Sequence, residues 1–103
     1  MPEVPSQILV VEDEKEIREL MALHLLRQSY KVKEAASAEE AMADLKNSSY
    51  SLIVLDWMLP GLSGLDLMEY VHRQAPSTSV LMVTAKTEPQ DIVLGLERGA
   101  DDY

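Results

Sequence analysis

Acidic residues and a hydroxyl stand directly after three short apolar runs. Glu12 and Asp13 follow "QILVV", and Asp56 follows "SLIVL". Thr84 ends a third run, "SVLMVT". If the first two runs are neighbouring parallel strands, the three carboxylates converge at one edge of the sheet, with the hydroxyl close by. Like charges in one place repel and raise one another's pKa, and a bound divalent cation removes that conflict. Because all the donors are oxygens, the pattern favours Mg²⁺.

A simpler interpretation of the first acidic group also exists. Glu12, Asp13 and Glu14 could cap a following helix, whose N-terminus favours negative charge. Taken alone, the run of acidic residues fits that interpretation better. Taken together with Asp56 and Thr84 after two other apolar runs, it favours the cation site.

The apolar runs must be strands for this site to form. They lack polar alternation, which is typical of strands covered on both faces in a parallel sheet. "YKVKEA" alternates more and predicts a strand nearer an edge. Helical patterns lie between these runs: residues 14–28 with apolar spacing, a capping box at Ser37 and Glu40, a helix over Leu65, Met68 and Val71 that ends before Pro76, and a helix over residues 89–98 with Gly99 as its cap.

Strand and helix therefore alternate four times before the chain reaches "ADDY". This order predicts an α/β fold with a parallel sheet and right-handed crossovers. A chain of 103 residues is enough for one domain and no more.

Composition excludes several classes of protein. With no cysteine, the chain has no disulfide framework, thiolate zinc site or catalytic thiol. Its net charge of −9 argues against direct binding of nucleic acid, although solubility alone would also explain an acidic surface. The apolar runs are too short to span a bilayer, and "MPEVPSQ" is unlike a secretory signal. We therefore expect a soluble cytoplasmic protein without membrane association.

Four segments in a fixed order carry a family resemblance: "ILVVEDE", "LIVLDWMLPGLSG", "VLMVTA" and "GADDY". The chain resembles the receiver domain of a two-component response regulator, and it is most similar to the OmpR/PhoB branch. The resemblance implies a CheY-like (flavodoxin-like) doubly wound parallel sheet of order 2-1-3-4-5. We expect residues 1–103 to form one receiver domain, with the fifth strand incomplete, the fifth helix missing and no second domain.

The resemblance also implies a role for each acidic residue. Asp56 would be the phosphoacceptor that attacks a phosphohistidine on a partner kinase. Asp13 would bind Mg²⁺ (or Mn²⁺) directly, and Glu12 would bind it through water. The carboxylate of Asp56 and the backbone carbonyl of Met58 would complete the protein's share of the metal ligands.

Other positions match residues that sense or shape the site. The resemblance implies that Thr84 contacts a phosphoryl oxygen and that Tyr103 is the switch aromatic, which rotates inward when Thr84 moves. Pro60 and Gly64 would shape the loop after the phosphoacceptor. Taken alone, an ordinary turn also explains Pro60 and Gly61, and strand propensity also explains Thr84.

Two side chains are expected to govern the lifetime of the phosphoryl group. In this fold the residues two positions after Asp56 and Thr84 overhang the site, and here they are Met58 and Lys86. Met58 cannot orient water by hydrogen bonding, and a charged Lys86 cannot act as a base. We therefore expect slow self-dephosphorylation, as suits transcriptional control.

The implied partners are a sensor histidine kinase and a second copy of the chain, through the face of the fourth helix. The output would be transcriptional, through a DNA-binding domain outside this sequence. The family pattern continues after "GADDY" with a lysine and a fifth helix, whereas this sequence stops at Tyr103. The domain would act as a signalling phosphoacceptor and catalyse only its own phosphotransfer and slow dephosphorylation.

Four alternatives remain. A haloacid-dehalogenase-type phosphatase would need a carboxylate at Met58, and a nucleotide-binding domain would need a glycine-rich loop where "EDEKE" stands. A receiver-like scaffold that works by protein contact alone would typically lack Asp56 or the acidic pair. A histidine phosphotransfer helix could use His24 or His72, but the four strand signals argue against a helical bundle.

Overall fold

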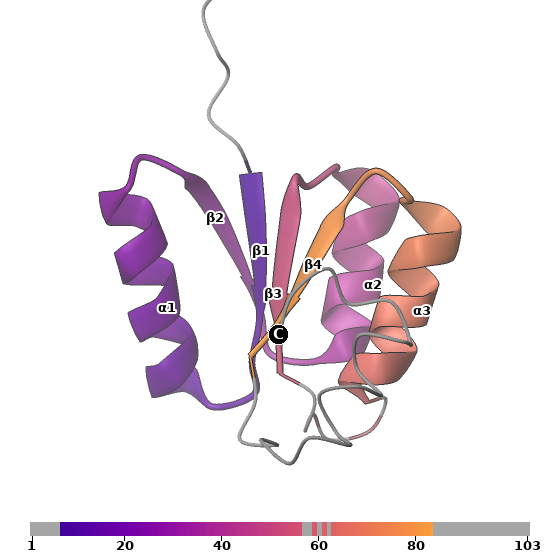
Figure 1. Ribbon diagram of the computed structural model, residues 1–103. Coiled ribbons are helices and arrows are strands. Elements are labelled where there is room, and N and C mark those ends of the chain that lie inside the picture. Colours follow the sequence, from indigo (N-terminus) through magenta and orange to yellow (C-terminus); the bar gives the residue numbers. More distant parts are fainter. Residues whose placement is uncertain (1–6, 57–58, 60, 62, 84–103) are drawn as a thin grey trace, which may run out of the picture.

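The computed structural model describes residues 7–56, 59, 61 and 63–83, in which strands and helices alternate as predicted (Figure 1). The elements are β1 (Gln7–Val11), α1 (Lys15–Arg27), β2 (Lys31–Ala35), α2 (Ala38–Asn47), β3 (Leu52–Leu55), α3 (Gly64–Gln74) and β4 (Ser79–Met82). The predicted helix over residues 89–98 and the start of a fifth strand lie outside the described residues.

The four strands form one parallel sheet in the order β2-β1-β3-β4. Val11, the last residue of β1, pairs with Ala35 on one side and with Leu55 on the other, and Leu55 pairs with Met82. All four strands therefore end at the same edge of the sheet. This confirms the parallel α/β prediction and the strand order 2-1-3-4, with the "YKVKEA" strand at an edge.

Helices cover both faces of the sheet, with α1 on one face and α2 and α3 on the other (Figure 1). Successive residues of a strand point to opposite faces, so each central strand contributes to two cores. The larger core lies under α2 and α3, and the smaller lies under α1. Members of the larger core include Leu9, Val11, Ile53, Leu55, Leu67, Met68 and Val71, and the buried members of the smaller are Ile8, Val10 and Val54. Burial on both faces explains why β1 after Gln7 and the whole of β3 are apolar.

Side-chain caps begin the two helices of the larger layer. Ser37 Oγ accepts a hydrogen bond from the Glu40 N–H at 3.1 Å, which confirms one half of the predicted capping box. The other half differs, because the Glu40 carboxylate accepts from the N–H of Ala36 at 2.7 Å, one residue before the cap. A complete box begins α3, where Ser63 and Asp66 bond reciprocally. That helix ends at Gln74, before Pro76 as predicted.

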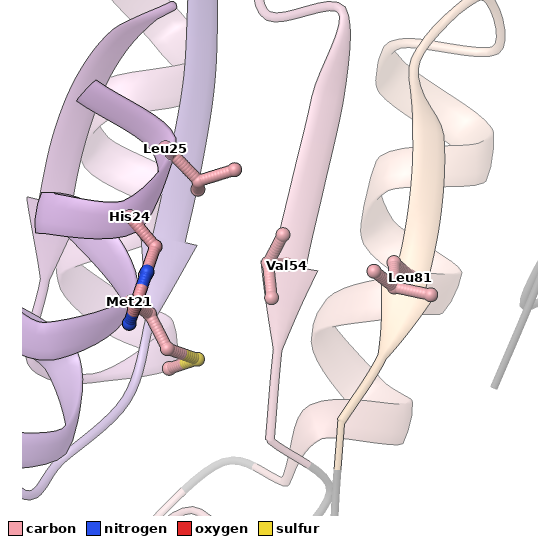
Figure 2. A pocket seen from close by; sticks show the side chains of 5 residues that line it. All are labelled: Met21, His24, Leu25, Val54 and Leu81. Carbon is pink, nitrogen blue, oxygen red and sulfur yellow. The ribbon is translucent and has the colours of Figure 1, made fainter. Parts of the chain in front are cut away.

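The helix α1 contacts the sheet along a narrow strip. Met21 and Leu25 pack against the smaller core, and Figure 2 shows them facing Val54 of β3. Together with His24 and Leu81 they line an apolar pocket of about 240 Å³. The remaining large apolar residues of the helix are 44% to 55% exposed: Ile17, Leu20, Leu23 and Leu26. The helical spacing in the sequence therefore predicted the helix but not which side of it would be buried.

Candidate functional site

Three carboxylates meet where the two central strands end. Glu12 directly follows β1, and Asp56 directly follows β3, its neighbour in the sheet. Glu12, Asp13 and Asp56 each offer a carboxylate oxygen, and these oxygens all lie within 4.8 Å of one another. The structure thus brings together the three acidic residues that the strand assignment predicted would converge.

Main-chain hydrogen bonds continue the sheet past the strand ends and fix the backbone of the site. The N–H of Glu12 donates to the carbonyl of Ala35 at 3.1 Å, and the N–H of Asp56 donates to the carbonyl of Val11 at 3.2 Å. Because these bonds extend the buried strands, the Cα positions of both acidic residues are set by the core of the sheet.

The three carboxylates differ in their access to water. Glu12 is buried with 5% of its surface exposed, Asp56 is half-buried, and Asp13 is exposed. The pKa of the Glu12 carboxyl is raised from 4.5 to about 7: burial is the largest cause, the hydrogen bond and charge of Asp56 also raise it, and the Glu14 N–H lowers it. That N–H donates to Glu12 Oε1 at 3.2 Å. Near neutral pH the cluster without a cation therefore holds a proton for part of the time.

The comparisons with known proteins agree with this arrangement. Residues 8–103 match the family model of the response regulator receiver domain. The chain belongs to this family. Solved receivers share its fold: a CheY-like receiver from Methanospirillum hungatei superposes with a TM-score of 0.90 at 32% identity, over 97% of this chain and 80% of that one. For the chemotaxis protein CheY4 of Vibrio cholerae the TM-score is 0.90 at 28% identity, over 96% and 84%.

Curated relatives of this receiver domain are transcriptional regulators. The chain is 41% identical to ResD of Bacillus subtilis over 98 residues, which are 95% of this chain and 40% of ResD. It is 45% identical to PhoP of Bacillus subtilis (95% and 41%) and 44% identical to PhoB of Klebsiella pneumoniae (94% and 43%). The chain thus spans less than half the length of these relatives. It is a receiver domain of the kind found in OmpR/PhoB-type response regulators.

The donor set of the acidic cluster fits a hard divalent cation. Three carboxylate oxygens that lie close together, one of them buried, match the oxygen coordination that Mg²⁺ prefers. The raised pKa of Glu12 also fits, because a cation and a proton compete for the same charge. The residues present can therefore hold the metal that the receiver family implies.

The loop after Asp56 contains a residue whose backbone conformation favours glycine. Gly61 has a φ of +74°, a conformation that residues with a side chain rarely adopt. Gly64 is instead the first residue of α3 and is buried. Five other residues with expected roles lie outside the described part of the chain: Met58, Pro60, Thr84, Lys86 and Tyr103.

Sequence reasoning missed Arg18, which contacts the site from α1. Its Nη1 donates to the main-chain oxygen of Glu12 at 2.9 Å. A signal was present. A basic residue in the first turn of a helix is repelled by the positive end of the helix dipole, so a nearby carboxylate or carbonyl oxygen is expected to compensate its charge.

We expect Gly61→Ala to destabilise the domain by about 1 to 2 kcal/mol, the usual cost of placing a Cβ in the left-handed region. The new Cβ would also lie 2.9 Å from Glu39 Oε2, but the end of that flexible side chain can move away. Urea unfolding of Gly61→Ala, alone and in a Glu39→Ala background, separates the two causes. Recovery of full stability in the double variant would show that the contact, not the backbone, sets the cost.

We expect Glu12 to make the cation-free domain less stable as pH rises. Because its folded pKa of about 7 exceeds the ordinary 4.5, the folded state binds more protons than the unfolded state between these values. The contribution of Glu12 to the free energy of unfolding is fully present below about pH 4.5 and is lost as the pH rises to about 7. Glu12→Gln removes it, so the stability of the variant relative to wild type should rise across this window.

Urea unfolding in EDTA at several pH values measures this difference, and Glu16→Gln, an exposed change on α1, is the control. Parallel pH profiles for wild type and Glu12→Gln would contradict the assigned pKa.

Proposed function

We propose that this receiver domain accepts a phosphoryl group on Asp56 from a sensor histidine kinase. The observation that carries the proposal is the convergence of Glu12, Asp13 and Asp56 at the ends of β1 and β3. In the transfer, a carboxylate oxygen of Asp56 attacks phosphorus, the bond from phosphorus to the kinase imidazole breaks, and the electron pair of that bond stays on the imidazole. The product on the receiver is an acyl phosphate.

The chain's own residues supply position and charge for this step. The hydrogen bond from the Asp56 N–H to Val11 holds the nucleophile at the end of a rigid strand, and half-burial leaves it open to an incoming phosphoryl group. Mg²⁺ or Mn²⁺ would be held directly by Asp13, Asp56 and the backbone carbonyl of Met58. Glu12 would hold it through water. When bound, the cation neutralises charge on the carboxylates and the phosphoryl oxygens. A proton on Glu12, whose pKa is raised to about 7, would compete with the cation.

The remaining roles follow the family resemblance. Thr84 would hydrogen-bond a phosphoryl oxygen, Tyr103 would report the change to the output surface, and Met58 and Lys86 would leave the phosphoryl group long-lived. The output is transcriptional, as the names of ResD, PhoP and PhoB suggest, through a DNA-binding part distinct from the receiver. With a net charge of −9, the receiver itself does not bind nucleic acid.

The receiver pairs with a second copy through the face of the fourth helix and works in the cytoplasm. Among the helices in the described residues, none is both long and apolar enough to cross a membrane.

Intact-mass spectrometry tests the proposal. The chain is incubated with a small-molecule phosphodonor, once with Mg²⁺ and once with EDTA. We expect the mass of one phosphoryl group to be added in Mg²⁺ and not in EDTA. A chain that stays unmodified in both would contradict the proposal and favour a receiver-like scaffold that acts by protein contact.

A further inference from the structure

The side chain of Arg18 links three elements at the edge of the sheet that carries the acidic cluster. Arg18 lies in the first turn of α1, where its N–H donates to the Glu14 carbonyl at 2.9 Å. Its side chain reaches back toward the strand ends and is only 15% exposed. Nη1 donates to the main-chain oxygen of Glu12 at 2.9 Å, and Nε donates to Glu34 Oε1 on β2 at 3.2 Å.

These contacts bear on the position of Glu12, the buried member of the cluster. Its N–H is held by Ala35 of β2, its main-chain oxygen by Arg18, and its carboxylate by the N–H of Glu14. Since Arg18 is itself tied to Glu34 on β2, it closes a bridge from α1 through the end of β1 to β2. The main-chain N–H and the main-chain oxygen of Glu12 are thereby both held by neighbouring elements.

We propose that Arg18 is a positioning residue for the cation site, because it fixes the backbone of Glu12 and so the place of the Glu12 carboxylate. This inference rests on the proposed function, since it names a residue that prepares the same site. Arginine suits the task because its rigid fork can hold two acceptors in a set geometry, which a single ammonium cannot.

Two effects of Arg18 on a cation oppose each other. Its positive charge repels the cation, whereas its hydrogen bond to Glu12 keeps a ligand in place. The ion pair with Glu34 offsets much of the charge, so we expect the positional effect to dominate. A double variant, Arg18→Gln with Glu34→Gln, tests this directly, because it removes one charge of each sign and leaves the net charge unchanged.

Isothermal titration calorimetry of Mg²⁺ into the whole chain measures the result. We expect the double variant to bind Mg²⁺ about 10-fold more weakly, the lower range for loss of a partner that orients a ligand. The control pair is Lys15→Gln with Glu19→Gln, which removes an exposed ion pair from the same helix at the same net charge. We expect wild-type affinity in this control.

Native-state hydrogen exchange gives a second readout that needs no metal. In the double variant the amides of Glu12 and Glu14 should exchange faster, while the Leu67 amide, bonded to Ser63 in α3, should keep its wild-type rate. If wild type itself binds no Mg²⁺, the metal part of the proposed function fails, and the exchange rates alone decide the role of Arg18.

If Arg18→Gln with Glu34→Gln does not fold, a second double variant, Arg18→Met with Glu34→Gln, takes its place in both measurements. Methionine keeps an apolar stem at position 18. Wild-type Mg²⁺ affinity or wild-type exchange at Glu12 in the variant that folds would overturn the proposal.

Discussion

Asp56→Asn is expected to abolish phosphoryl uptake while leaving the fold intact. An amide has nearly the shape of the carboxylate but lacks the charged oxygen that attacks phosphorus. The main-chain bond from residue 56 to Val11 does not depend on the side chain, so the end of β3 should keep its position. Intact-mass spectrometry with a small phosphodonor and Mg²⁺ should then give the unmodified mass for the variant and the phosphorylated mass for wild type.

The same substitution elsewhere provides the control for this experiment. Asp44 lies on α2, outside the acidic cluster, and Asp44→Asn changes the net charge by the same amount. Asp44→Asn should take up phosphate as wild type does. Equal uptake by wild type and Asp56→Asn would mean that another residue is modified, and it would remove Asp56 from its proposed role.

Unfolding of the Asp56→Asn variant adds a second expectation. Because one of three adjacent carboxylates becomes neutral, repulsion within the cation-free cluster should fall. The free energy of unfolding in EDTA should therefore equal or exceed that of wild type. A large loss of stability would indicate that Asp56 makes a structural contact on which the fold depends.

Mg²⁺ is expected to stabilise the folded domain by about 2.7 kcal/mol at a hundred times its dissociation constant. The reason is that the three carboxylates converge only when β1 and β3 are paired, so the unfolded chain offers no such site. Urea unfolding at a fixed pH, with and without Mg²⁺ and at matched ionic strength, measures the gain. Matching the ionic strength matters because salt alone screens the repulsion.

Asp13→Asn should remove most of this gain. Asp13 is the exposed member of the cluster, so its replacement leaves the core unchanged while it takes away one carboxylate ligand. The control is Glu16→Gln, a nearby exposed change on α1 outside the cluster, which should keep the full response to Mg²⁺. A full Mg²⁺ response in Asp13→Asn would exclude Asp13 as a ligand.

Much of the fold could be predicted from local patterns alone. A strand in the middle of a parallel sheet is buried on both faces, so residues 8–11 of β1 and all of β3 had to be apolar. The runs before Glu12 and Asp56 are recognisable for that reason. Alternation with helices then predicted the parallel sheet, and the sheet predicted that residues after the strands share an edge. The convergence of the acidic residues needed in addition that β1 and β3 be neighbours, which the family resemblance implied and the structure shows.

The burial of the site residues was decided only by the tertiary structure. Glu12 and Asp13 are neighbours of the same chemical type, yet one is buried and the other exposed. Glu12 still bonds to Ala35 of β2 in line with the strand, whereas Asp13 lies in the bend that follows, so the burial of each depends on the neighbouring elements rather than on the local sequence. The raised pKa of Glu12 follows from that burial and from Asp56, which is distant in the sequence.

The packing of α1 had to come from the tertiary structure for a related reason. Its apolar residues are spread around much of the helix, so the period of 3.6 predicted a helix but left its orientation open. The sheet selects the side with Met21 and Leu25 and leaves Leu20 exposed. The same docking carries Arg18 to Glu12 and Glu34, because a long side chain finds its acceptors only after the helix and two strands have assembled.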